Sequence, residues 1–184
     1  MLMNSRIVAL GAALALGLAA SGAQAAPAMA GKAVTVGGAP MYPSKTIVEN
    51  AVNSKDHTTL VAAVKAAGLV DTLNGPGPFT VFAPTNAAFS KLPAGTLDTL
   101  VKPENKGTLT TILTYHVVPG RLAAADLKDG QTLTTVQGGT LTVHKRGTSV
   151  TLTDAKGGVS KVTILNVWQS NGVIHVVDTV LMPQ

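Results

Sequence analysis

The side chains best suited to chemistry in this chain of 184 residues are its four histidines, His57, His116, His144 and His175. They lie far apart in the sequence and show none of the short spacings typical of metal ligands. The chain has no cysteine, no G-x-S-x-G nucleophile motif, no H-E-x-x-H metal motif and no glycine-rich phosphate loop. A Ser/His/Asp triad stays open, because triads are recognised by geometry. The sequence therefore predicts no catalytic residue, no metal site and no cofactor, and we do not expect an enzyme.

Two of the histidines occur in contrasting surroundings. His175 lies inside the apolar run 173–177, so its imidazole is expected to be buried and hydrogen-bonded. We expect a neutral ring bound by a backbone group or by the turn at Thr85 and Asn86, and a pH-sensing role is the alternative. His144 precedes Lys145 and Arg146, which favours a solvated strand face.

Tyr115 and His116 form the pair at which a binding site is predicted. A tyrosine suits recognition, because its ring can be covered while its hydroxyl stays hydrated, and it suits packing for the same reason. The pair has apolar neighbours at the end of a predicted helix, which favours a core role. Both roles stay open at this point.

Residues 77–89 predict a strand that runs directly into a capped helix. The strand is expected over 78–83, where aromatic and small apolar residues alternate with threonine. Pro84 ends the strand because proline has no N–H to donate, and Thr85 or Asn86 can then cap the helix. The structural residues predicted in this motif are Phe79, Phe82, Pro84, Thr85, Asn86 and Phe89.

Two later segments complete a recognisable set. They are residues 114–120, which contain Tyr115-His116-Val-Val-Pro-Gly, and residues 171–183, which contain His175 and Asp178. Together with 77–89, they resemble the signature of the fasciclin domain, an extracellular adhesion module, over roughly Ser44 to Met182. The resemblance implies that the last strand pairs beside the Phe79 strand. It also links the Tyr-His pair to adhesion and integrin recognition.

The hydrophobic patterning changes along the chain. Helical spacing is expected at 47–52, 60–67, 85–92, 96–101 and 103–113, with Asp56 as a candidate cap and Gly68 as a stop. From Tyr115 onward the period becomes two, with turn signals between strands, and Asp126 and Asp178 are interpreted as cap or turn residues. The predicted fold is therefore α+β, an antiparallel β-sandwich or wedge with a cluster of short α-helices from the N-terminal half. The fasciclin resemblance implies the same architecture.

The N-terminal residues predict the destination of the protein. Arg6, the uncharged run 7–20 and the Ala23-Gln24-Ala25 site are typical of a secretory signal peptide over 1–25. The run is short for a membrane anchor, so no integral membrane span is expected after cleavage near Ala25. Residues 26–43, rich in Ala, Gly and Pro, predict a flexible tether before a fasciclin domain at 44–182. The expected location is secreted, either periplasmic or extracellular.

The charge and composition of the chain limit the classes of molecule that it is expected to bind. Cleavage leaves 13 Lys and Arg against nine Asp and Glu, a net charge of +4, and the basic residues are scattered. Nucleic acid is excluded, because a basic stripe with stacking aromatic residues is missing. The predicted function is non-enzymatic cell adhesion or attachment to a cell-surface or matrix protein or polysaccharide. The alternative is a carrier of an apolar ligand such as a carotenoid, and a homodimer stays possible.

Overall fold

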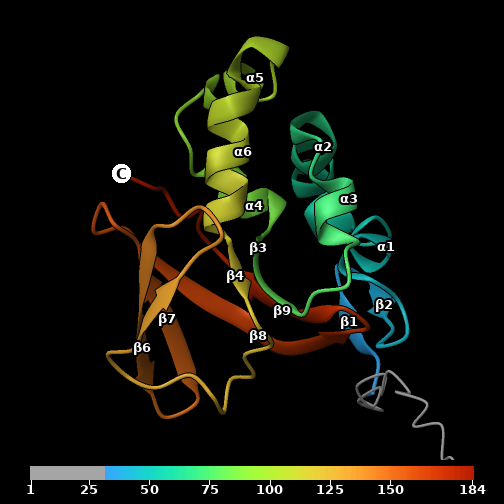
Figure 1. Cartoon of the computed structure of the whole chain (residues 1–184), viewed down its shortest axis with the longest axis vertical. Helices are drawn as coiled ribbons and strands as arrows, with labels where there is room; N and C mark the ends of the chain where they lie inside the picture. Colours follow the sequence, from blue (N-terminus) through green and yellow to red (C-terminus); the bar gives the residue numbers. More distant parts are fainter. Residues whose placement is uncertain (1–31) are drawn as a thin grey trace, which may run out of the picture.

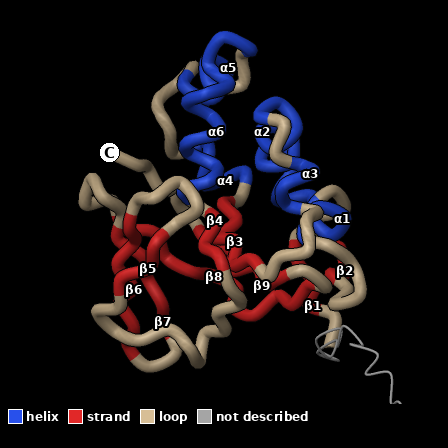
Figure 2. Tube along the Cα trace, viewed as in Figure 1, coloured by secondary structure: helices blue, strands red, loops and turns tan. Residues whose placement is uncertain are grey.

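The computed structural model describes residues 32–184, so the predicted signal peptide and the first part of the predicted tether lie outside the described residues. Helices gather at one end of the molecule and strands at the other (Figure 1, Figure 2). The helices are α1 (Ile47–Ala51), α2 (Thr58–Ala67), α3 (Val70–Leu73), α4 (Asn86–Ser90), α5 (Thr96–Leu100) and α6 (Lys106–Tyr115), with 3-10 turns at Lys55–His57 and Pro103–Asn105. Each helix within 32–184 falls short of the length and apolarity that a membrane crossing requires.

The strands form one small hairpin and one large sheet. The hairpin consists of β1 (Val34–Val36) and β2 (Ala39–Met41). The sheet has the order β4-β3-β9-β8-β7-β6-β5. Its strands are β3 (Phe79–Pro84), β4 (Val117–Pro119), β5 (Thr132–Thr134), β6 (Thr140–Arg146), β7 (Ser149–Thr153), β8 (Val159–Gln169) and β9 (Gly172–Val177).

The sheet is mixed and nearly closed. β3 and β9 run parallel, from the pair Phe79 and Gly172 to the pair Pro84 and Val177, whereas the other neighbours are antiparallel. Just after β5, the Val136 N–H donates to the carbonyl of Val117 in β4 at 2.8 Å, which brings the two edges of the sheet together. The predicted pairing of the last strand beside the Phe79 strand is confirmed. The predicted α+β class with a cluster of short helices is confirmed, whereas an antiparallel sandwich or wedge is not, because β3 and β9 run parallel within one mixed sheet.

Alternate side chains of β3 and β9 pack into two separate hydrophobic cores. Val81 and Ala83 of β3 pack with the helices, and we call this cluster the helix-side core. Phe82, between them, packs with side chains of β5–β9 in what we call the strand-side core. Successive side chains of a strand point to opposite faces, so a central strand with two covered faces is apolar throughout. The continuous apolar sequence of both strands follows from this position.

The N-terminal hairpin corrects the prediction of a flexible tether over 26–43. Val36 and Met41 are each only 1% exposed and belong to the helix-side core. The turn between the two strands is Gly37-Gly38, where φ is +58° and +77°, values that favour glycine. The tether interpretation is therefore wrong for residues 34–41. Each strand of the hairpin has only three residues, so the alternation of its side chains is hard to recognise within a Gly- and Pro-rich segment.

The helix ends show which capping predictions hold. The Thr85 hydroxyl accepts the Ala88 N–H at 3.2 Å, so its predicted cap on α4 is confirmed, and Gly68 ends α2 with φ of +71°. Asp56 is not a side-chain cap of α2. The start of α2 is instead bound by Asn86, whose Oδ1 accepts the Thr59 N–H at 3.0 Å. Asn86, which belongs to the strand-helix motif 77–89, thus accepts from one of the backbone N–H groups that the start of a helix leaves without a partner.

Candidate functional site

Tyr115, the last residue of α6, lies in the core. Its side chain is fully buried, and its hydroxyl donates to the Thr140 carbonyl at 2.6 Å while accepting the Ala155 N–H at 2.9 Å. The ring also touches the turn before β6, because a Cβ added at Gly139 would meet a ring carbon at 2.7 Å. Tyr115 therefore ties the end of α6 to two turns of the sheet.

His116 is also buried, with 2% of its surface exposed, and both ring nitrogens are bonded. Its Nδ1 lies 2.8 Å from the Ile112 carbonyl, and its Nε2 lies 2.9 Å from the Leu181 N–H. A carbonyl only accepts and a backbone N–H only donates, so the proton is on Nδ1 and the ring is neutral. Burial of both Tyr115 and His116 supports the packing role and argues against direct contact of either side chain with a partner.

The C-terminal segment, residues 178–184, is held by His116 and by the carboxylate of Asp154. The Leu181 N–H is bound by His116, and the Met182 N–H donates to Oδ2 of Asp154 at 3.0 Å. The other oxygen of Asp154 accepts the backbone N–H groups of Lys156 at 3.0 Å and Gly158 at 2.7 Å. One turn of the sheet therefore anchors the end of the chain.

His175 is buried and bonded by backbone groups, which is one of the two predicted arrangements. Its Nε2 is 2.8 Å from the Leu122 carbonyl, and its Nδ1 accepts the Asn166 N–H at 3.3 Å. The ring stacks on Phe82, with centroids 5.7 Å apart. The expected partner in the Thr85-Asn86 turn is therefore wrong, because β9 presents His175 to the strand side while that turn faces the helices.

The remaining motif residues have structural contacts. Phe79 is half-buried and Phe89 is buried, and both pack on the helix-side core. Pro84 is the last residue of β3, as the sequence predicts. Asp178 accepts the Lys161 N–H at 2.9 Å and the Thr179 hydroxyl at 3.0 Å, which is a turn role.

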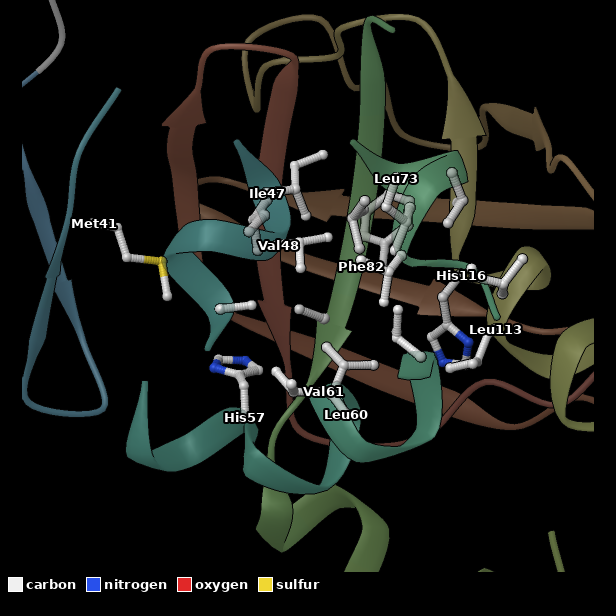
Figure 3. Close-up of a pocket in the computed structure, with 18 residues that line it drawn as sticks. Met41, Ile47, Val48, His57, Leu60, Val61, Leu73, Phe82, Leu113 and His116 are labelled. Atoms are coloured by element: carbon white, nitrogen blue, oxygen red, sulfur yellow. The ribbon is translucent and has the colours of Figure 1, made fainter. Parts of the chain in front are cut away.

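A partly open apolar cavity of about 40 Å³ lies between the helices and the sheet (Figure 3). Its walls come from α1, α2, α3, α6, β3, β4 and β9 together with Met41 and His57. His57 is 1% exposed, and its Nδ1 lies 2.9 Å from the Ser54 hydroxyl. Its Nε2 is buried and has no hydrogen-bond partner among residues 32–184. The sequence reasoning did not single out His57, and a Ser-x-x-His spacing before a helix is the only signal that could have done so.

The chemistry available to these groups is limited. Within residues 32–184, no three His, Asp, Glu or Cys side chains lie close enough to hold a metal ion. His144 is the one histidine in this part of the chain within 4 Å of a carboxylate oxygen, 3.9 Å from Asp129 on the exposed outer face. The buried histidines are bonded to backbone groups or to a serine. The site therefore offers packing, hydrogen bonding and an apolar cavity.

Burial lowers the pKa of each buried histidine. The pKa of His116 falls from 6.5 to about 4, because desolvation of the charged ring outweighs the favourable Ile112 carbonyl and the Asp154 charge. Burial also lowers the pKa of His57 and of His175, each partly opposed by a neighbouring carbonyl. A charged His116 would carry a proton on Nε2, facing the Leu181 N–H.

Acid is therefore expected to destabilise the fold. Between pH 6.5 and 4 the unfolded chain binds a proton at His116 that the folded chain rejects, so stability falls as pH falls through this window. The contribution from His116 is about 3 kcal/mol of unfolding free energy, present in full above pH 6.5 and lost by about pH 4. Urea unfolding at pH 7, 5.5 and 4.5 measures it. An unfolding free energy that stays flat from pH 7 to 4.5 would contradict the buried neutral ring.

The comparisons with known proteins agree with this geometry. The model of the fasciclin domain matches residues 55–183. Protein sll1483 of Synechocystis is 48% identical over 154 residues, which cover 83% of this chain and 81% of that protein. The immunogenic protein MPB70 of Mycobacterium bovis is 45% identical over 141 residues, 72% of this chain and 66% of the relative. The cell surface glycolipoprotein MPB83 of the same species is 43% identical over 141 residues, and the match spans 58% of its length.

A solved structure shows the same fold. A FAS1 domain pair from the insect cell adhesion molecule fasciclin I superposes with a TM-score of 0.68 at 19% identity, and the match covers 77% of this chain and 52% of that one. The mixed, nearly barrel-shaped sheet with its cluster of helices is thus the FAS1 arrangement. With the family model matching most of residues 32–184, the chain belongs to the fasciclin-domain family.

Proposed function

We propose that this protein is a secreted, non-enzymatic attachment protein that binds a polysaccharide of a cell surface or matrix. Family membership supports adhesion, because one relative is named a cell surface glycolipoprotein and the solved structure belongs to a cell adhesion molecule. With Tyr115 and His116 in the core, a different surface must make the contact.

The observation that carries the proposal is a face of threonines on the sheet. Each of the neighbouring strands β5, β6 and β7 contains a Thr-Leu-Thr tripeptide, and the three leucines are buried. Thr132 pairs with Thr142, which pairs with Thr153 on the next strand. We call the six outward residues the threonine face: Thr132, Thr134, Thr140, Thr142, Thr151 and Thr153.

The hydroxyls of this face are available to a ligand. Among the six, within the described part of the chain, only Thr151 uses its hydroxyl internally, in a bond of 3.5 Å to the His144 carbonyl. A hydroxyl both donates and accepts, which suits the hydroxyl-rich surface of a polysaccharide. Residues 121–161 also carry six Lys and Arg against three Asp, so an acidic polysaccharide is favoured over a neutral one.

The carotenoid alternative has less support. The volume of the cavity, about 40 Å³, is about a quarter of the 150 Å³ that holds one benzene molecule. A polyene would require the helices to move apart over their whole length. Attachment therefore stays the proposal, and absence of colour in the purified protein would agree with it.

Co-sedimentation with isolated, protein-free envelope polysaccharide tests the proposal. Replacing Thr132, Thr142 and Thr153 together by alanine removes one row of hydroxyls and is expected to weaken binding about tenfold or more. The matched control replaces Thr72, Thr99 and Thr108, which are exposed on the helices α3, α5 and α6. Equal loss in both variants, or no binding by the unaltered protein, would overturn the threonine face. Binding only to protein-containing envelope would indicate a protein partner instead.

A further inference from the structure

The cavity between α1, α2, α3 and the sheet has one polar feature that its packing does not explain. Its walls are otherwise formed by apolar side chains such as Leu60, Val64 and Val81 (Figure 3). His116 also contributes to the wall, but both of its ring nitrogens are bonded elsewhere. His57 is therefore the only wall residue with a free polar ring atom, among the residues that the structure describes.

An unpartnered buried nitrogen is costly. Leaving a buried donor or acceptor without a partner costs about 1–3 kcal/mol, so native proteins rarely do it without a reason. The Ala83 backbone lies close enough to raise the His57 pKa slightly, but Nε2 makes no hydrogen bond of acceptable geometry with it. A water molecule is a poor substitute, since buried waters usually make about three hydrogen bonds and this cavity offers one.

The hydrogen-bonding capacity of the His57 ring and the apolar side chains of the cavity determine which chemical group could bond Nε2. Ser54 can either donate to Nδ1 or accept from it, so Nε2 is either a donor or an acceptor. A hydroxyl satisfies both cases, whereas a carbonyl satisfies only one. No Lys, Arg, Asp or Glu lines the cavity, so a charged group would be buried without a counter-ion.

The size of the cavity limits the rest of the molecule. A volume of about 40 Å³ is too small for an aromatic ring in the present conformation. The half-buried side chains Val48, Val61 and Val70 form its outer wall on α1, α2 and α3, where an alkyl chain can continue toward solvent.

We propose that this cavity binds a small, uncharged, apolar molecule with one hydroxyl group, which hydrogen-bonds Nε2 of His57 while the alkyl part contacts the valine and leucine side chains. The site is separate from the threonine face, on the helical side of the sheet. It thus adds a ligand to the attachment function and does not depend on it.

NMR titration of the protein with 1-butanol, butyrate and 1-chlorobutane tests this site. We expect 1-butanol to shift the amides of residues 60–64 and the ring nitrogens of His57 in a saturable way. Butyrate should bind about tenfold more weakly or worse at pH 7, because its charge would be desolvated. 1-Chlorobutane should bind about fivefold more weakly, because it cannot replace the hydrogen bond.

Variants separate the hydrogen bond from the apolar contact. His57→Phe should weaken 1-butanol binding about fivefold and leave 1-chlorobutane binding unchanged or stronger. His144→Phe, on the exposed outer face, is the control and should change neither. If His57→Phe does not fold, the ring-nitrogen shifts of the unaltered protein decide the matter. Absence of saturable shifts, or equal affinity for 1-butanol and 1-chlorobutane with unmoved ring nitrogens, would overturn the proposal.

Discussion

Replacing Tyr115 by alanine is expected to destabilise the protein by about 3–5 kcal/mol, as large aromatic truncations in cores do. The side chain is fully buried, and its loss would open a cavity between α6 and the turns at Gly139 and Ala155. The two hydrogen bonds of its hydroxyl would be lost with it, leaving a backbone N–H and a carbonyl unpaired. Urea unfolding at pH 7 measures the change.

Two further variants separate the causes. Tyr115→Phe keeps the ring and removes only the hydroxyl, so a smaller loss of about 1–3 kcal/mol is expected. Tyr42→Ala is the exposed control, since Tyr42 is 45% exposed, and should change stability by about 0.5 kcal/mol or less. A stable Tyr115→Ala protein with weakened polysaccharide binding would instead show that this residue contacts the partner.

Phe82→Ala is expected to cost a similar amount, about 3–5 kcal/mol. Phe82 has no exposed surface, lies on a central strand and stacks on His175. Part of the loss, about 0.5–1.5 kcal/mol, should come from that aromatic pair. Thermal and urea unfolding of the same variant measure the total.

The matched variant is Phe82→Leu, which retains most of the apolar volume and loses the ring. A loss of about 1–2 kcal/mol is expected, smaller than for alanine because the remaining cavity is smaller. In the alanine variant the His175 ring should also become more accessible, which its NMR signals report. Equal stability of the alanine and unaltered proteins would contradict the two-core arrangement around β3.

Local features of the fold were predictable because they depend on neighbouring residues. The strand at 79–84, its end at Pro84 and the cap by Thr85 follow from alternation, a missing donor and a hydroxyl at the right position. The stop at Gly68 follows from its left-handed backbone. Each of these needs only a few residues of sequence.

Features that depend on distant pairing were not predictable from the residues alone. The parallel alignment of β3 with β9 and the contact of Val136 with Val117 join segments far apart in the chain. The partners of His175, Leu122 and Asn166, are loop and strand positions without any distinguishing residue type. Backbone groups can bond a histidine from almost any sequence, so no pattern marks them.

The cavity was missed for a related reason. Its wall side chains are the same Val, Leu and Ile that fill a core, and only the packing of three short helices leaves a space among them. His57 then matters because one ring nitrogen lacks a partner, which is a property of the assembled structure. Sequence patterns indicate which residues are apolar, but they do not indicate where packing leaves an unfilled space between apolar side chains.

The position of β9 has a consequence for the order in which the chain is made. β9 is the last strand of the sheet in chain order, yet it lies between β3 and β8 in the middle of the sheet. A growing chain that has not yet reached Gly172 has β3 without its parallel neighbour and neither core closed. Strand pairings of such long sequence separation form slowly, because a long loop must close first. The domain therefore reaches its native structure only after β9 has been synthesised, and a product that ends before Gly172 would remain open to proteolysis.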